Sequence, residues 1–226
     1  MTKKQRAYAA LVENRKKCRL CVGLTNPSVS KLRHFDSDHI GPWSRLHGDL
    51  NADLMVVGQD WGDVDYYVKH SGLDDLKNPT MRNLETILKH IGFDVSCTSY
   101  SNKKQGLFLT NAILCLKRGG LQAKIDPKWV ENCGHAFLRH QIEIVRPKVV
   151  VGLGASAFQI ILNAFEKPRV KLSEAISDPL GCSLGEGIRL FAAYHCGSGV
   201  VNRTRDLETQ CIDWERIGKF LKSSDR

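Results

Sequence analysis

The sequence predicts an α/β protein, a three-layer α/β/α sandwich with a central, mainly parallel, four-stranded sheet. Four short runs are apolar throughout rather than alternating, as expected for strands that are covered on both faces. Segments with helical periodicity lie between these runs, and strands that alternate with helices form parallel sheets. The sequence shows no internal repeat or low-complexity linker, so we expect a single domain over residues 1–226.

Each element follows from its local pattern. Residues 3–17 have apolar positions on one face and a basic last turn, which predicts an amphipathic helix. Residues 18–51 lack a period and contain Gly, Pro and Asp, so we expect a cysteine-containing loop that packs, together with the first helix, on the domain. We expect strands at 53–57, 107–114, 148–153 and 188–194, and further helices at 80–91, 127–145, 155–165 and 205–221.

Composition and charge restrict the class of protein. The net charge of +9, from 33 basic and 24 acidic side chains, favours a polyanionic partner and leaves open whether it is DNA or RNA. The sequence has no apolar run of membrane-spanning length and no apolar segment typical of a secretory signal near Met1. We therefore expect a monomeric cytoplasmic protein that does not bind membranes.

Eight cysteines are many for such a chain, and a reducing compartment disfavours disulfides. A metal or cluster site is the better interpretation, although a C-x-x-C pair alone would favour a pair of free or buried thiols. The cysteines are Cys18, Cys21, Cys97, Cys115, Cys133, Cys182, Cys196 and Cys211.

Polar residues follow the predicted strands. Ligands of such sheets bind beyond the carboxyl ends of the strands. A carboxylate, a carboxamide, a Gly-rich turn and an imidazole should therefore meet at one edge, which predicts a functional site. These groups belong to Gly58-Gln59-Asp60-Trp61 after the first strand, Asn111 in the second, Gly152-Leu153-Gly154 after the third and His195 after the fourth.

The order and spacing of these motifs resemble the uracil-DNA glycosylase superfamily, most closely its iron–sulfur-containing members. The resemblance covers about residues 18–195. It implies a monofunctional DNA glycosylase that flips uracil or a modified pyrimidine out of DNA and hydrolyses its N-glycosidic bond, leaving an abasic site. The motifs that carry it are Cys18-x-x-Cys21, the first strand with Gly58, Thr110-Asn111 with Cys115, Cys133 ahead of Gly152-Leu153-Gly154, and Tyr194-His195.

The resemblance also implies a cofactor. Cys18, Cys21, Cys115 and Cys133 would hold a [4Fe–4S] cluster whose role is structural. Four thiolates suit zinc equally well on chemical grounds, so zinc remains the alternative.

The loop after the first strand departs from the family pattern Gly-Glu-x-Pro-Gly, because Gln59 replaces the glutamate and Trp61 the proline. Gly58-Gln59-Asp60 instead resembles the Gly-Gln-Asp-Pro motif of another branch of the superfamily. This implies that Asp60 orients the attacking water and stabilises a cationic sugar. The alternative is that Asp60 only caps the following turn.

Other residues have roles by the same resemblance. Asn111 would read the edge of the flipped base, and His195 would donate a hydrogen bond to the departing base. The alternative for each is a structural side chain, and Cys196, where the family has proline, is interpreted as an incidental thiol. The residue that stacks on the base is expected at Leu76, with Tyr66, Tyr67 or Trp61 as alternatives.

Residues 197–205 follow His195, where the family has a loop that wedges into the duplex. Val200 or Val201 would form the wedge, and Arg203 and Arg205 would contact phosphates. The alternative is a flexible turn before the last helix.

Four basic residues, Lys117 and Arg118 with Lys103 and Lys104, are expected on a solvated basic face.

Two further interpretations of the function stay open. The altered loop after the first strand also allows a non-catalytic, metal-containing nucleic-acid-binding module on the same fold, or a glycosylase specific for a bulky modified base in foreign DNA.

Overall fold

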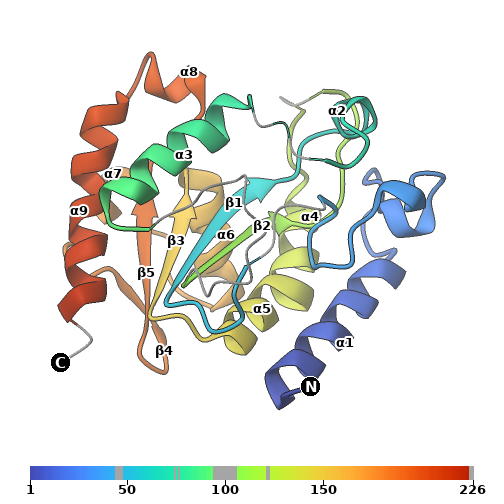
Figure 1. Cartoon of the computed structure of the whole chain (residues 1–226), viewed down its shortest axis with the longest axis horizontal. Coiled ribbons are helices and arrows are strands. Elements are labelled where there is room, and N and C mark those ends of the chain that lie inside the picture. Colours follow the sequence, from blue (N-terminus) through green and yellow to red (C-terminus); the bar gives the residue numbers. More distant parts are fainter. Residues whose placement is uncertain (44–47, 74, 76, 94–105, 121–122, 224–226) are drawn as a thin grey trace.

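The structure is a computed structural model of the chain, and it describes residues 1–43, 48–73, 75, 77–93, 106–120 and 123–223 (Figure 1). Its centre is a five-stranded sheet with strand order β2-β1-β3-β5-β4. The four expected strands are present and mutually parallel, which confirms the α/β class. They are β1 (Leu54–Asp60), β2 (Leu107–Ile113), β3 (Val149–Leu153) and β5 (Ile188–Ala193).

The expected strand number was wrong by one, because β4 (Cys182–Gly185) extends the sheet antiparallel to β5. This strand is four residues long and has an irregular register between Ser183 and Gly185. Its neighbours Gly181 and Gly187 have positive φ angles, and such glycines are typical of turns. The short, glycine-flanked segment therefore gave no strand pattern in the sequence.

Helices cover both faces of the sheet, as the layered prediction requires (Figure 1). Met55 and Val57 of β1 belong to one apolar core, whereas Leu54 and Val56 belong to the other. Because neighbouring strand residues point to opposite faces, this alternation separates two layers. The first core is packed by α1 (Lys3–Lys17), α4 (Pro127–Cys133), α5 (Arg139–Val145) and α6 (Ala155–Ala164), and the second by α3 (Pro79–His90) and α9 (Leu207–Ser223).

The single helix expected over 127–145 is continuous but irregular. A π-helical stretch, Gly134–Leu138, joins α4 to α5 without a break. The structure also contains short helices that the sequence pattern did not predict. They are α2 (Val64–Lys69), α7 (Leu172–Ala175), α8 (Ser198–Val201) and the 3₁₀ turns Pro27–Val29 and Arg33–Phe35. In the described part of the chain, no helix has the length and apolar character needed to cross a membrane.

The N-terminal loop packs on the domain through buried polar contacts. The guanidinium of Arg15, a fully buried side chain of α1, pairs with Asp36 at 2.6 Å. The Asn26 side-chain amide donates hydrogen bonds to the carbonyls of Arg15 (2.8 Å) and Cys18 (3.0 Å). These bonds close the C-terminal end of α1 and fix the chain where the first cysteine begins the loop.

Candidate active site

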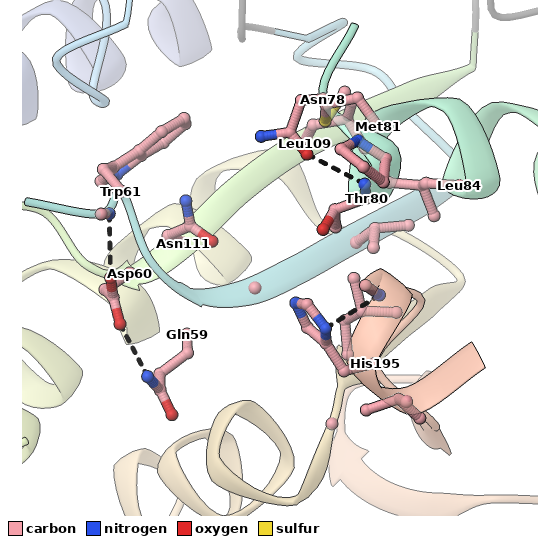
Figure 2. Close-up of a pocket in the computed structure, with 18 of the residues that line it drawn as sticks. Gln59, Asp60, Trp61, Asn78, Thr80, Met81, Leu84, Leu109, Asn111 and His195 are labelled. Carbon is pink, nitrogen blue, oxygen red and sulfur yellow. Dashed lines mark hydrogen bonds between the residues drawn. The ribbon is translucent and has the colours of Figure 1, made fainter. Parts of the chain in front are cut away.

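The strand register brings the expected residues to one edge of the sheet. Gly58 of β1 lies beside Asn111 of β2, and Asp60 is the last residue of β1. His195 follows β5 by two residues and Gly154 follows β3, both at the carboxyl ends of these parallel strands. Figure 2 shows the Asp60, Asn111 and His195 side chains around the same hollow.

The carboxylate of Asp60 is held by three donors. The Gln59 side-chain amide donates to Oδ2 at 2.6 Å, and the backbone N–H of Gly62 donates to Oδ1 at 2.9 Å. The ammonium of Lys117 lies 3.2 Å from Oδ2, and the Asp60 and Lys117 side chains are only 7% and 2% exposed. The expectation that Lys117 lies on a solvated face was therefore wrong, whereas Arg118 is exposed.

Asn111 reaches the cavity because Gly58 has no side chain. A Cβ atom at Gly58 would lie 2.0 Å from Asn111 Oδ1, well inside van der Waals contact. Among the residues that the structure describes, the Asn111 carboxamide has no hydrogen-bond partner. Its donor and its acceptor are thus available to a ligand in the cavity.

The imidazole of His195 is fixed by the turn that follows it. The backbone N–H of Gly197 donates to Nδ1 at 3.0 Å, so in the neutral ring the proton is assigned to Nε2. Burial lowers the pKa of His195, and the charge of Asp60 opposes this effect. A neutral imidazole with a donor Nε2–H can hydrogen-bond to a developing anion.

These side chains line a cavity of about 840 Å³, within the range of about 300–1,000 Å³ that ligand sites occupy. Gly58, Gln59, Asp60, Trp61, Asn111, His195 and Val200 all lie in its wall. One side of the cavity, the first turn of α3, was not predicted from the sequence. That turn contributes Asn78, Thr80 and Met81 (Figure 2), and an Asn-Pro pair ahead of a helical pattern is the signal that predicts such a turn.

The structure separates the candidates for the stacking residue. Tyr66 and Trp61 line the cavity, and the Asn78 side chain donates to the Tyr66 hydroxyl at 3.3 Å. Tyr67 is fully buried beneath Trp43. Leu76 lies outside the described residues.

The segment after His195 forms the short helix α8 and a turn. Val200 is half-buried in the cavity wall and Arg203 is exposed. Arg205 is paired with Asp213 through bonds of 2.9 and 2.5 Å and lies over the Tyr194 ring. Val200 and Arg203 are therefore better placed than Arg205 to contact a ligand.

The C-x-x-C loop is docked against α4. The Trp129 indole N–H donates to the Val22 carbonyl at 2.8 Å, and the Asn132 side chain lies 3.6 Å from Cys21 Sγ. Thr25 and Leu116 exchange two backbone hydrogen bonds, of 2.8 and 2.9 Å, which brings the loop beside the segment after β2.

The four expected ligand thiols influence one another. A hydrogen bond with Cys133 lowers the pKa of Cys21 to about 6, and the same bond, with burial, raises the pKa of Cys133. Burial raises the pKa of Cys115 to about 12, and charges at Cys18 and Cys21 add to this effect. Within the described ranges, however, no three His, Cys, Asp or Glu side chains are grouped as ligands of one metal ion.

Cys196, the cysteine that follows His195, contacts the protein interior. Cys196 is fully buried, and its thiol donates to the Thr80 carbonyl at 3.3 Å. Burial raises the pKa of this thiol to about 12, so it is a poor nucleophile at neutral pH.

Sequence comparisons show which known proteins the chain is similar to. A type-5 uracil-DNA glycosylase of Pyrobaculum aerophilum is 26% identical over 88% of this chain and 86% of its own length. A type-4 uracil-DNA glycosylase of Archaeoglobus fulgidus is 29% identical over 52% of this chain and 58% of its own length. A type-4 uracil-DNA glycosylase of Thermotoga maritima is 27% identical over 53% of this chain and 59% of its own length. The family model of the uracil DNA glycosylase superfamily matches residues 46–214, three quarters of the chain, so the protein belongs to that superfamily.

Proposed function

We propose that the protein is a monofunctional DNA glycosylase that hydrolyses the N-glycosidic bond of uracil, or of a modified pyrimidine, flipped out of DNA. The observation that carries the proposal is the meeting of Asp60, Asn111 and His195 in the wall of one cavity. The relatives' names, uracil-DNA glycosylase, support the reaction class.

Each side chain has a part in this reaction. Asn111 offers a donor and an acceptor, which match a pyrimidine carbonyl and the adjacent N3–H. His195 donates from Nε2 to the base oxygen that becomes negative as the bond breaks. Asp60 places a negative charge where the sugar becomes an oxocarbenium ion and orients the water that adds to C1′. The base leaves with the bond electrons, and the water proton passes to solvent or to the departing base.

The net charge of +9 and the loop after His195 support the proposal that the protein binds DNA. We propose that Val200 enters the duplex beside the extruded nucleotide and that Arg203 contacts a phosphate. Arg205 would act on DNA only after releasing Asp213, so we assign its main role to holding the turn.

The four cysteines are proposed to hold a [4Fe–4S] cluster with a structural role, with zinc as the alternative. Their chemistry fits either group, because all four donors are thiols and the charges at Cys18 and Cys21 act on Cys115. A bound cluster would supply cross-linking of the N-terminal loop to the sheet. Iron, sulfide and zinc analysis of anaerobically purified protein, with the visible spectrum, distinguishes the two.

The test of the reaction uses uracil-containing oligonucleotides, single- and double-stranded, followed by alkali. Wild-type protein should leave alkali-labile abasic sites, and Asp60→Asn should not. Excision of a larger modified pyrimidine, but not uracil, would favour the modified-base specificity. DNA binding without excision of any pyrimidine would favour the non-catalytic binding module and refute the proposal.

A further inference from the structure

Lys117 lies two residues after Cys115, in the segment that follows β2, and its side chain reaches Asp60 at the end of β1. Residues 60–64, which follow from Asp60, are called the catalytic loop below. The backbone N–H of Lys117 donates to the Gly62 carbonyl at 3.1 Å, and its carbonyl accepts from Val64 N–H at 3.0 Å. This short parallel bridge places the lysine against residues 62–64. The side chain is 2% exposed and does not line the cavity.

The ion pair with Asp60 runs from the protein interior to the cavity wall. Lys117 is at the buried end, and Asp60 is at the end that lines the cavity. A buried carboxylate is costly without a compensating charge, and the ammonium at 3.2 Å supplies one. Gln59 and Gly62 also donate to the carboxylate. Together with these two hydrogen bonds, the ion pair fixes the direction in which Asp60 presents its oxygens.

We propose that Lys117 is the positioning residue for Asp60, and that it acts on base excision only through that carboxylate. The inference rests on the proposed glycosylase function. Lys117 touches neither base nor sugar in this account, since it is absent from the cavity wall. It is therefore distinct from a lysine that would attack C1′ as a nucleophile.

The same segment connects the pair to the cysteine-bearing loop. Leu116, between Cys115 and Lys117, exchanges both of its backbone hydrogen bonds with Thr25 of that loop. Leu116 is itself fully buried. The position of the ammonium is thus set by the sheet, by the catalytic loop and by the N-terminal loop together.

A double-mutant cycle tests the proposal with single-turnover excision and steady-state kinetics on the substrate identified for the wild type. Lys117→Met should lower kcat by about 10²-fold, the loss expected for a misplaced catalytic group, and leave KM for DNA unchanged. Lys117→Arg, which keeps the charge, should restore most of kcat. In the Asp60→Asn background, Lys117→Met should cause no further loss, because its target is already gone. Lys219→Met, which removes an 80% exposed ammonium on α9, is the matched control.

Thermal unfolding identifies variants that fail to fold. If Lys117→Met does not fold, Lys117→Arg and the double variant Asp60→Asn/Lys117→Met still decide, since the first keeps the buried charge and the second removes both members of the pair. Equal losses in both backgrounds, a raised KM with unchanged kcat, or a borohydride-trapped DNA adduct that requires Lys117 would each overturn the inference while leaving the glycosylase function intact. Absence of base excision by the wild type would refute the proposed function, and the inference with it.

Discussion

Substituting Gly58 by alanine tests how closely the base-reading amide depends on the neighbouring strand. The added Cβ would lie 2.0 Å from Asn111 Oδ1, whereas ordinary contact begins at 3.4 Å, so the carboxamide must retreat by 3.4 − 2.0 = 1.4 Å. A hydrogen bond of about 2.9 Å that is stretched by this amount is lost.

The magnitude follows from the bonds that Asn111 would make. Two hydrogen bonds to the base edge, at about 0.5–1.5 kcal/mol each, amount to about 1–3 kcal/mol. Gly58→Ala should therefore lower kcat/KM for excision by roughly 5- to 160-fold, at about 1.36 kcal/mol for each factor of ten. Fold stability should change little, because alanine is favoured over glycine within a strand by about 0.5–1 kcal/mol.

Single-turnover excision with protein in excess measures this effect. Gly134→Ala is the matched control, since a Cβ there meets its nearest atoms at 3.7 Å. In an Asn111→Ala background, Gly58→Ala should cost nothing more, because the clashing oxygen has been removed. A full loss in that background, or wild-type activity of Gly58→Ala, would refute the reasoning.

Three further predictions concern Asp60, His195 and the thiols. Asp60→Asn should lower kcat by about 10²–10³-fold with DNA binding retained, measured by single-turnover excision and by fluorescence anisotropy; retained kcat would remove Asp60 from the mechanism. Burial lowers the pKa of His195, so between that lowered pKa and the ordinary value of about 6.5 the unfolded state binds more protons, and stability falls as the pH drops across this window and levels off below it. His195→Gln should make denaturation midpoints less dependent on pH in that range, and an unchanged slope would contradict this. Cys133→Ala should lose bound metal by elemental analysis, whereas Cys196→Ser should retain it; the reverse pattern would exclude Cys133 as a ligand.

The parallel core of the fold could be predicted because its strands are buried on both faces. Val149, Val150 and Val151 are fully buried, and such runs have no polar side for solvent. β4 lacks this signal: it lies at the edge of the sheet, and of its four residues only Leu184 is buried. Edge strands of this length are set by tertiary pairing with a neighbour rather than by a local pattern.

The polar residues at the strand ends were predictable for a topological reason, since parallel strands place their carboxyl ends together. Asp60, Asn111 and His195 therefore fall in one cavity wall. Lys117 was not predictable in this way. A lysine between a leucine and an arginine is typical of a surface, and only the bridge to residues 62–64 turns it inward to Asp60.

The helix α3 was expected from the sequence, but the contribution of its first turn to the cavity was not. Its residues reach the cavity through tertiary packing of α3 over the strand ends, which no local pattern encodes. Tyr66 reaches the wall for a similar reason, because the short helix α2 is capped by Asp63 of the catalytic loop.

The most direct measurement of the central claim is mass-spectrometric detection of the free base released from DNA under single-turnover conditions. Wild-type protein should release free uracil or a modified pyrimidine in equal amount to abasic sites, and Asp60→Asn and Asn111→Ala, at matched DNA occupancy, should release far less. Equal release by wild type and both variants, or bound DNA with no released base, would contradict the claim that these side chains form a base-excision site.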